Sequence, residues 1–234
     1  MKKLIPILLV IALLFSLTSC NLGEPVTFEY DAEGVRENIE NIFDTKGLAI
    51  TLAVTLQDDL EDADGFTTFT YAEYQDIYMV VTEDETYICD FSDPLCATLY
   101  VQNDLDEWKK TVIYYNGESG YTREQLEMEY FDLRETLISY LCLYTTFSGL
   151  PLRESETVVA GRECDEYTFG LSLFGFGVES HFSVDRETGI CLSGEFGAAL
   201  GDEGDMNVTF VCKDFSTPFT IICPIFVSSE SIVR

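Results

Sequence analysis

Apolar and polar residues alternate with a period of two along much of this chain, and that pattern predicts a sheet of many short strands. In residues 49–56, Ile50, Leu52, Val54 and Leu56 alternate with alanine and threonine. Ten more segments carry similar half-apolar patterns between short polar turns: 66–74, 76–82, 85–91, 97–102, 110–115, 155–161, 162–174, 178–185, 189–196 and 206–215. About eleven strands follow from this reading.

Two segments instead have the spacing of amphipathic helices. The first runs from Asp31 to about Lys46, with Val35, Ile39 and Phe43 on one face and Gly47 as the stop signal. The second starts at a capping box formed by Thr122 and Gln125, and Gly149 and Pro151 end it. Its apolar stripe consists of Leu126, Tyr130, Leu133, Leu137, Tyr140, Leu141 and Tyr144.

The order of helix, strands, helix, strands predicts an α+β fold, a large curved antiparallel sheet with two amphipathic helices on its concave side. A sheet of this size curls, and Gly170, Gly175 and Gly177 permit bends. The inner sheet face and the helical stripes either fill the space between them or leave a dry cavity for an apolar ligand. The candidate ligand-binding residues are Tyr130, Leu137, Tyr167, Phe169, Leu171, Phe182 and Phe210.

The first 20 residues have the layout of a secretory signal. Two lysines precede an apolar run from Leu4 to Leu17, which is shorter than the roughly 20 residues that span a bilayer. The sequence "LTSC" ends it and resembles a bacterial lipobox, which implies cleavage between Ser19 and Cys20 and a diacylglyceryl group on Cys20. We therefore expect a signal peptide at 1–19, a lipidated tether at 20–30, one domain at 31–226 and a tail at 227–234. The expected location is the extracytoplasmic face of a bacterial membrane.

Charge excludes some partners. The full chain has a formal charge of −29, and removal of 1–19 reduces Lys+Arg from 13 to 11 against 42 Asp+Glu, which gives −31. Such a surface repels nucleic acid, so we expect no nucleic-acid partner. Hydrophobic residues make up 47% of the chain and aromatic residues 13%, and this composition favours a folded domain over disorder.

Seven cysteines remain after Cys20, and an odd number cannot all pair within one chain. Cys89 and Cys96 flank a short loop and could close it, while Cys191 and Cys212 lie on strands that are expected to be neighbours. The alternative is that most are small buried thiols. The spacing matches no zinc or thioredoxin motif, so no metal site is expected.

The sequence holds no GxSxG, HExxH or P-loop motif. The single histidine, His181, falls on the outward side of its strand. Residues 58–65, "DDLEDADG", fail the calcium-loop pattern, because Leu60 takes the first ligand position. We expect neither an enzyme nor a cofactor.

Three stretches, "TVVAGRECDEYTF", "HFSVDRETGICLSGEF" and "NVTFVCKDFSTPFTIICP", together with the helix–strands–helix–strands order, resemble the LolA/LppX-like superfamily of lipoproteins and lipoprotein carriers. The matching positions are Gly161, Asp185, Thr188, Gly189, Pro218, Ile221 and Pro224. The resemblance implies an unclosed β-barrel with helices as a lid. It implies a binding protein for an acyl chain, lipid or lipoprotein in the concave face, or alternatively an envelope interaction or sensor protein whose barrel is self-filled and whose partner is a membrane protein.

Overall fold

A computed structural model of the chain describes residues 25–58, 63–102, 105–116, 120–150, 152–173, 176–200, 205–225 and 227–233. The predicted signal peptide, Ser19 and Cys20 lie outside these residues. Twelve strands form one sheet: β1 (Leu48–Asp58), β2 (Ala63–Tyr74), β3 (Ile77–Val81), β4 (Thr86–Asp90), β5 (Cys96–Gln102), β6 (Trp108–Tyr114), β7 (Arg153–Val159), β8 (Arg162–Leu173), β9 (Phe176–Asp185), β10 (Cys191–Leu200), β11 (Asp205–Ser216) and β12 (Ser229–Val233).

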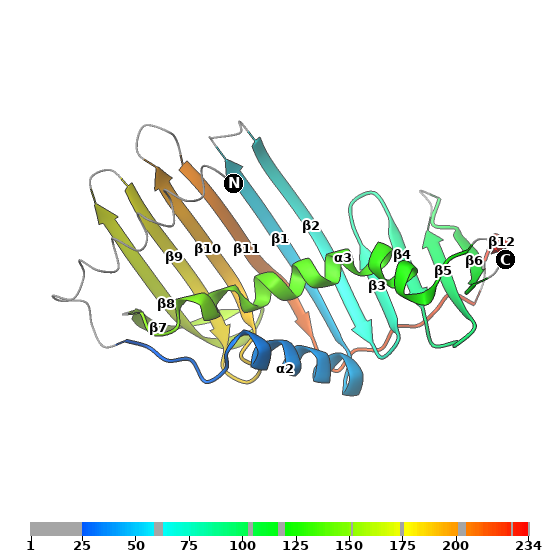
Figure 1. Ribbon diagram of the computed structural model, residues 1–234, viewed down its shortest axis with the longest axis horizontal. Coiled ribbons are helices and arrows are strands. Elements are labelled where there is room, and N and C mark those ends of the chain that lie inside the picture. Colours follow the sequence, from blue (N-terminus) through cyan, green and yellow to red (C-terminus); the bar gives the residue numbers. More distant parts are fainter. Residues whose placement is uncertain are drawn as a thin grey trace.

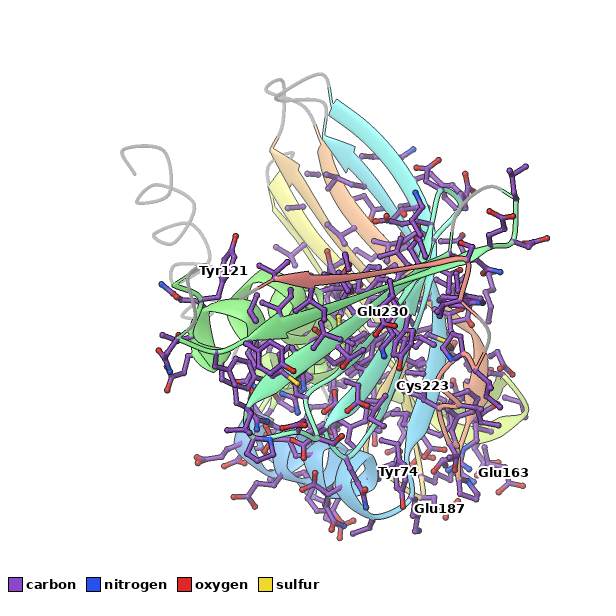
Figure 2. The ribbon with its side chains drawn as sticks, turned by 90° about the vertical axis from the view of Figure 1, so that its right-hand side faces the viewer. Tyr74, Tyr121, Glu163, Glu187, Cys223 and Glu230 are labelled. Carbon is purple, nitrogen blue, oxygen red and sulfur yellow. The ribbon has the colours of Figure 1, made fainter. Side chains whose placement is uncertain are left out.

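The sheet has two ends, so it does not close into a barrel. Its order is β12-β6-β5-β4-β3-β2-β1-β11-β10-β9-β8-β7, and every pair is antiparallel except β12 with β6. It twists strongly along its length (Figure 2). The fold class predicted from the sequence, an unclosed and mainly antiparallel sheet with few helices, is confirmed.

Both predicted helices are present on one face of the sheet (Figure 1). Helix α2 (Ala32–Thr45) is capped by the Asp31 side chain, which accepts a hydrogen bond from the Gly34 amide. It ends before Gly47, whose φ of 72° suits glycine. Helix α3 (Arg123–Cys142) has the expected capping box, and the 3₁₀ helix η1 (Leu143–Phe147) follows it directly.

A buried ion pair fastens α3 to the sheet. Arg134 Nε on α3 lies 2.9 Å from Glu73 Oε2 on β2, and the buried Tyr71 hydroxyl donates to the same oxygen at 2.6 Å. The guanidinium also lies over the Phe43 ring of α2, 5.4 Å from its centroid. The two helices and β2 therefore meet at one point.

The polypeptide after β11 crosses the opposite, convex face of the sheet. We call residues 217–225 the C-terminal strap. Its inward residues are Phe219, Ile221 and Cys223, and they pack on the outer face of the sheet, where Ala49, Ala72 and Ile88 are buried. The strap is a covering segment and not a strand of the sheet. One edge strand of the sheet is β12, which lies inside the predicted tail at 227–234.

Candidate functional site

The inner face of strands β8, β9, β10, β11 and β1 is built from one alternating set of residues. Tyr167 lies opposite Phe182, and Phe169 lies opposite Ser180. On the next strands, Phe196 lies opposite both Ser180 and Val208, and Val208 lies opposite Leu56. Because side chains alternate across a strand, these residues share the face that the helices cover.

The structure brings five of the seven predicted ligand-binding residues together in the core under the helices: Leu137, Tyr167, Phe169, Phe182 and Phe210. All are at most 9% exposed. The backbones of Tyr130 and Leu171 belong to α3 and β8, and their side chains lie outside the described set.

Aromatic rings from the chain itself occupy the space next to these residues. Phe28 lies 5.1 Å from the Tyr167 ring, Phe147 lies 5.7 Å from Phe169, and Tyr140 lies 5.6 Å from Phe210, centroid to centroid. We call Phe28, Tyr140, Tyr144 and Phe147 the aromatic plug. The sequence reading missed Phe28 because it stands in the predicted tether, and it missed Phe147 because the residue lies beyond the helical stripe.

Beyond the plug the inner face stays apolar but is only partly covered by the described residues. Leu56 is 38% exposed, and Val178, Phe196, Ala198 and Val208 are half-buried. We call these five residues the exposed apolar strip. Figure 1 shows α3 crossing the sheet at mid-height, so that the upper parts of β9, β10, β11 and β1 extend past it. The strip was not singled out from sequence, although the alternation in these strands runs on into it.

One buried polar atom lies between the plug and the strip. Ser180 is 1% exposed, and its hydroxyl has no hydrogen-bond partner among the described residues. Its neighbours across the sheet are Phe169 and Phe196. A buried hydroxyl without a hydrogen-bond partner is uncommon in folded proteins.

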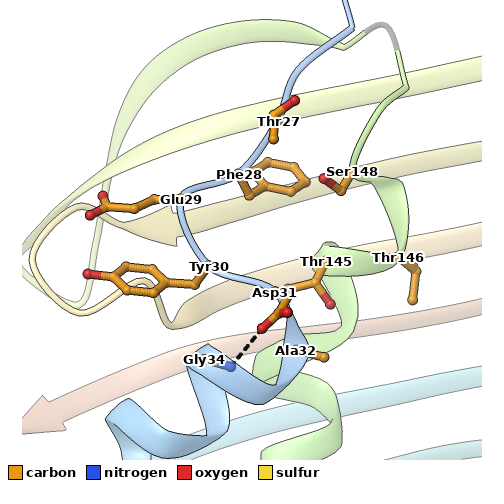
Figure 3. A pocket seen from close by; sticks show the side chains of 10 residues that line it. All are labelled: Thr27, Phe28, Glu29, Tyr30, Asp31, Ala32, Gly34, Thr145, Thr146 and Ser148. Atoms are coloured by element: carbon orange, nitrogen blue, oxygen red, sulfur yellow. Dashed lines mark hydrogen bonds between the residues drawn. The ribbon is translucent and has the colours of Figure 1, made fainter.

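Two hollows lie on either side of the segment Thr27–Tyr30. The larger, of about 570 Å³, separates this segment from η1 and the start of α2, and Glu29, Thr145, Thr146 and Ser148 are among its lining (Figure 3). The smaller, of about 150 Å³, is lined in part by Asp165, Asp185 and Arg186. Polar side chains contribute to the lining of both hollows, and no residue of the exposed apolar strip lines either of them.

The turn that carries the Asp-x-x-Thr-Gly pattern has a structural role. The Asp185 carboxylate, 2% exposed, accepts hydrogen bonds from the Thr188 amide and hydroxyl and from two guanidinium nitrogens of Arg162. Tyr144 in η1 donates to the Gly189 carbonyl at 2.9 Å. The turn therefore holds η1, and with it Phe147, against the inner face.

All seven cysteines among the described residues are free thiols. The pairs that could have formed disulfides, Cys89 with Cys96 and Cys191 with Cys212, are not joined here. Burial raises the thiol pKa to about 12 for Cys89 and Cys212, and it also raises that of Cys191. Cys191 and Cys212 each donate to a carbonyl of their own strand. These sulfurs behave as small buried apolar groups.

No known family model matches this sequence. Nor does any curated protein match it. The chain is similar to solved structures, among them a LolA superfamily protein from Nitrosomonas europaea (9% identity, 83% of this chain and 96% of that one, TM-score 0.26). A provisionally assigned outer membrane lipoprotein-sorting domain from Vibrio parahaemolyticus also matches, with 10% identity over 82% of this chain and 94% of that one and a TM-score of 0.26. A DUF1329 family protein from Desulfovibrio piger matches with 10% identity over 80% of this chain and 92% of that one and a TM-score of 0.23. The Nitrosomonas europaea protein belongs to the superfamily that the sequence resembles. Sequence identities and TM-scores this low carry no argument about function.

Within the described residues, no group of three or more His, Cys, Asp or Glu side chains is placed to hold a metal ion. None of the described helices combines the length and apolarity needed to cross a bilayer. His181 lies half-buried on the outer face, with Nδ1 3.3 Å from the Thr168 hydroxyl.

Proposed function

We propose that this chain is a lipid-anchored extracytoplasmic binding protein that holds an acyl chain, of a lipid or a lipoprotein, against its concave face. The observation that carries the proposal is the exposed apolar strip, where an apolar surface continues past the covering helices across four neighbouring strands. Each methylene that such a surface takes from water contributes about 0.8 kcal/mol.

The ligand would lie along the strip with one end at the aromatic plug. There it would meet Phe169 and Phe196, and a carbonyl or hydroxyl of the ligand would give the Ser180 hydroxyl a partner. Of the residues that the sequence put forward, Phe169 borders this path on β8, whereas Tyr167, Phe182 and Phe210 support it from within the core. Cys20 would carry the membrane anchor.

The experiment is native mass spectrometry of residues 21–234, purified without detergent from a bacterial host and then extracted with organic solvent. We expect a co-purifying acyl lipid near one-to-one ratio. Val208→Asp places a charge in the strip and should abolish the added mass. Val211→Asp is the matched control, because Val211 is also half-buried on β11 but lies on the outer face opposite Ala53. Equal lipid content in the two variants would contradict the site.

A second candidate follows from the aromatic plug, which fills the space between helices and sheet with the chain's own rings. In that case the protein acts as an interaction or sensor lipoprotein and carries no lipid. The same mass measurement distinguishes the two, because an apo mass that added lipids leave unchanged favours the self-filled protein. A membrane-bound protein partner would then be sought by crosslinking in cells.

A further inference from the structure

The two edges of the sheet are built differently. Edge strand β7 carries Arg153, Glu154 and Glu156, and Glu156 is paired with Arg186 of the β9–β10 turn at 2.7 Å. Charged side chains on an edge oppose pairing with another chain. The opposite edge, β12, has the sequence Ser-Glu-Ser-Ile-Val, with Glu230 as its one charged residue. It also has no proline and no bulge to block its free side.

Two polar side chains of β12, Glu230 and Ser231, contact side chains of β6. Lys110 Nζ lies 2.9 Å from Glu230 Oε1, and this contact raises the pKa of Lys110. The Thr111 and Ser231 hydroxyls lie 2.9 Å apart. Lys110 on β6 thus compensates the negative charge of Glu230. In Figure 2, which faces this end of the molecule, Glu230 lies beside the β12 ribbon in front of the other strands. The backbone groups on the outer side of β12 face no further strand of the described sheet.

The C-terminal segment that contains β12 carries little charge of its own, although its register partners on β6 include Lys109 and Lys110. Residues 216–233 contain one acidic residue and no lysine or arginine, in a chain with 42 Asp+Glu. Three isoleucines are exposed here, Ile222 at 81%, Ile225 at 86% and Ile232 at 55%. Two copies of so acidic a protein repel each other over most of their surface, and they approach at the lowest electrostatic cost along this segment.

We propose that β12 docks against β12 of a second copy of this chain, so that two sheets join edge to edge about a two-fold axis. A self-pairing edge strand under two-fold symmetry is antiparallel and uses the same residues on both sides. Backbone hydrogen bonds supply the pairing, and the two-fold axis passes at Ile232, so that the Ile232 side chains of the two copies pack beside each other. Because five-residue strands bury far less than the roughly 1,600 Å² of a standard interface, the dimer is weak and reversible.

The experiment is sedimentation equilibrium of residues 21–234, which include every described residue, over a wide range of subunit concentration. We expect a monomer–dimer equilibrium that tightens with added salt, since screening reduces the repulsion between acidic surfaces. Ile232→Lys places like charges close together across the joint and should weaken association by about tenfold or more. Val158→Lys, at a 66% exposed position on β7, should leave it unchanged.

Hydrogen exchange of the unaltered chain tests the same joint without a substitution. The β12 amides should exchange more slowly as the subunit concentration rises, and the β7 amides should not. A chain that stays monomeric at every concentration overturns the proposal. So does a dimer that Val158→Lys weakens as much as Ile232→Lys, or one whose β12 amides gain no protection.

Discussion

Gly194 on β10 lies where two aromatic rings close over the inner face. A Cβ atom added there would come within 2.4 Å of the Phe196 ring and 2.5 Å of the Phe210 ring. Phe210 is fully buried, so its ring has little freedom to move aside. The absence of a side chain at this position lets the rings of neighbouring strands stack, and Phe196 and Phe210 lie 6.2 Å apart with an interplanar angle of 17°.

We therefore expect Gly194→Ala to lower the free energy of unfolding by about 1–3 kcal/mol, the usual cost of overpacking a core. Gly197→Ala on the same strand is the control, because its added Cβ would meet nothing closer than 3.6 Å. That change should alter stability by less than about 0.5 kcal/mol. Urea unfolding measures both, and equal effects would show that the rings do not restrict position 194.

Glu73 gives a pH-dependent prediction at the same scale. Burial raises the pKa of Glu73, and this outweighs the lowering by Arg134 and by the hydrogen bond from Tyr71. The folded protein thus binds this proton more tightly than the unfolded chain does. The resulting stabilisation is fully present below the ordinary value of 4.5 and is lost as the pH rises through the folded pKa.

Glu73→Gln keeps an acceptor for Tyr71 and Arg134 but removes the titration. Relative to this variant, the wild-type protein should lose stability as the pH rises from about 4.5 through the raised pKa of Glu73. Urea unfolding at a series of pH values gives the difference, in which the other carboxylates largely cancel. If the stability difference between the two proteins does not change with pH, or grows in favour of the wild type as the pH rises, the pKa of Glu73 is not raised in the folded protein.

At the scale of elements, the C-terminal strap covers the convex face while α2, α3 and η1 cover the concave one. The inner residues of strands β1 to β6 alternate with outer residues that are also apolar, such as Met79, Ile88 and Tyr100. A sheet with apolar residues on both faces needs a cover on each side. The strap supplies the second cover with few residues and no regular structure of its own.

The strap offers a matched pair of adjacent isoleucines. Ile221 is 8% exposed and packs on the sheet, whereas Ile222 is 81% exposed. We expect Ile221→Ala to lower the free energy of unfolding by about 2–4 kcal/mol, because it leaves a cavity under the strap. Ile222→Ala should change it by less than about 0.5 kcal/mol. Thermal unfolding followed by circular dichroism checks both changes. A large loss of stability from Ile222→Ala alone would show that Ile222, and not Ile221, faces the sheet.

At the scale of the whole molecule, net charge opposes the compact state. Residues 21–234 have a formal charge of −31, since Lys2 and Lys3 fall outside them. Few of the 42 acidic residues can be paired with 11 basic ones, and the rest repel each other across the surface. This self-repulsion is long-ranged and is therefore sensitive to ionic strength.

We expect sodium chloride to raise the melting temperature of residues 21–234 at neutral pH, because it screens this repulsion. Near pH 4.1, where the sequence reaches zero net charge, the same salt should have a much smaller effect. Differential scanning calorimetry at both pH values measures the change. A melting temperature that falls with salt at neutral pH would mean that local ion pairs outweigh the net charge.

Local patterns in the sequence determined the elements. Period-two alternation located eleven of the strands, helical spacing located α2 and α3, and Thr122 with Gln125 marked the start of α3. Each of these signals acts between residues a few positions apart, where backbone geometry and burial alone decide the outcome. The sequence also indicated which residues face inward, as the burial of Phe182 and Phe210 confirms.

Tertiary structure decided what those inward residues touch. Phe28 and Phe147 reach the inner face from irregular segments, and β12 pairs with β6 from 120 residues away. Alternation says that a residue is buried but not which distant side chain buries it, because that depends on how loops close and where elements dock. For this reason the sequence identified an apolar inner face, whereas only the structure divided it into a plugged core and an exposed apolar strip.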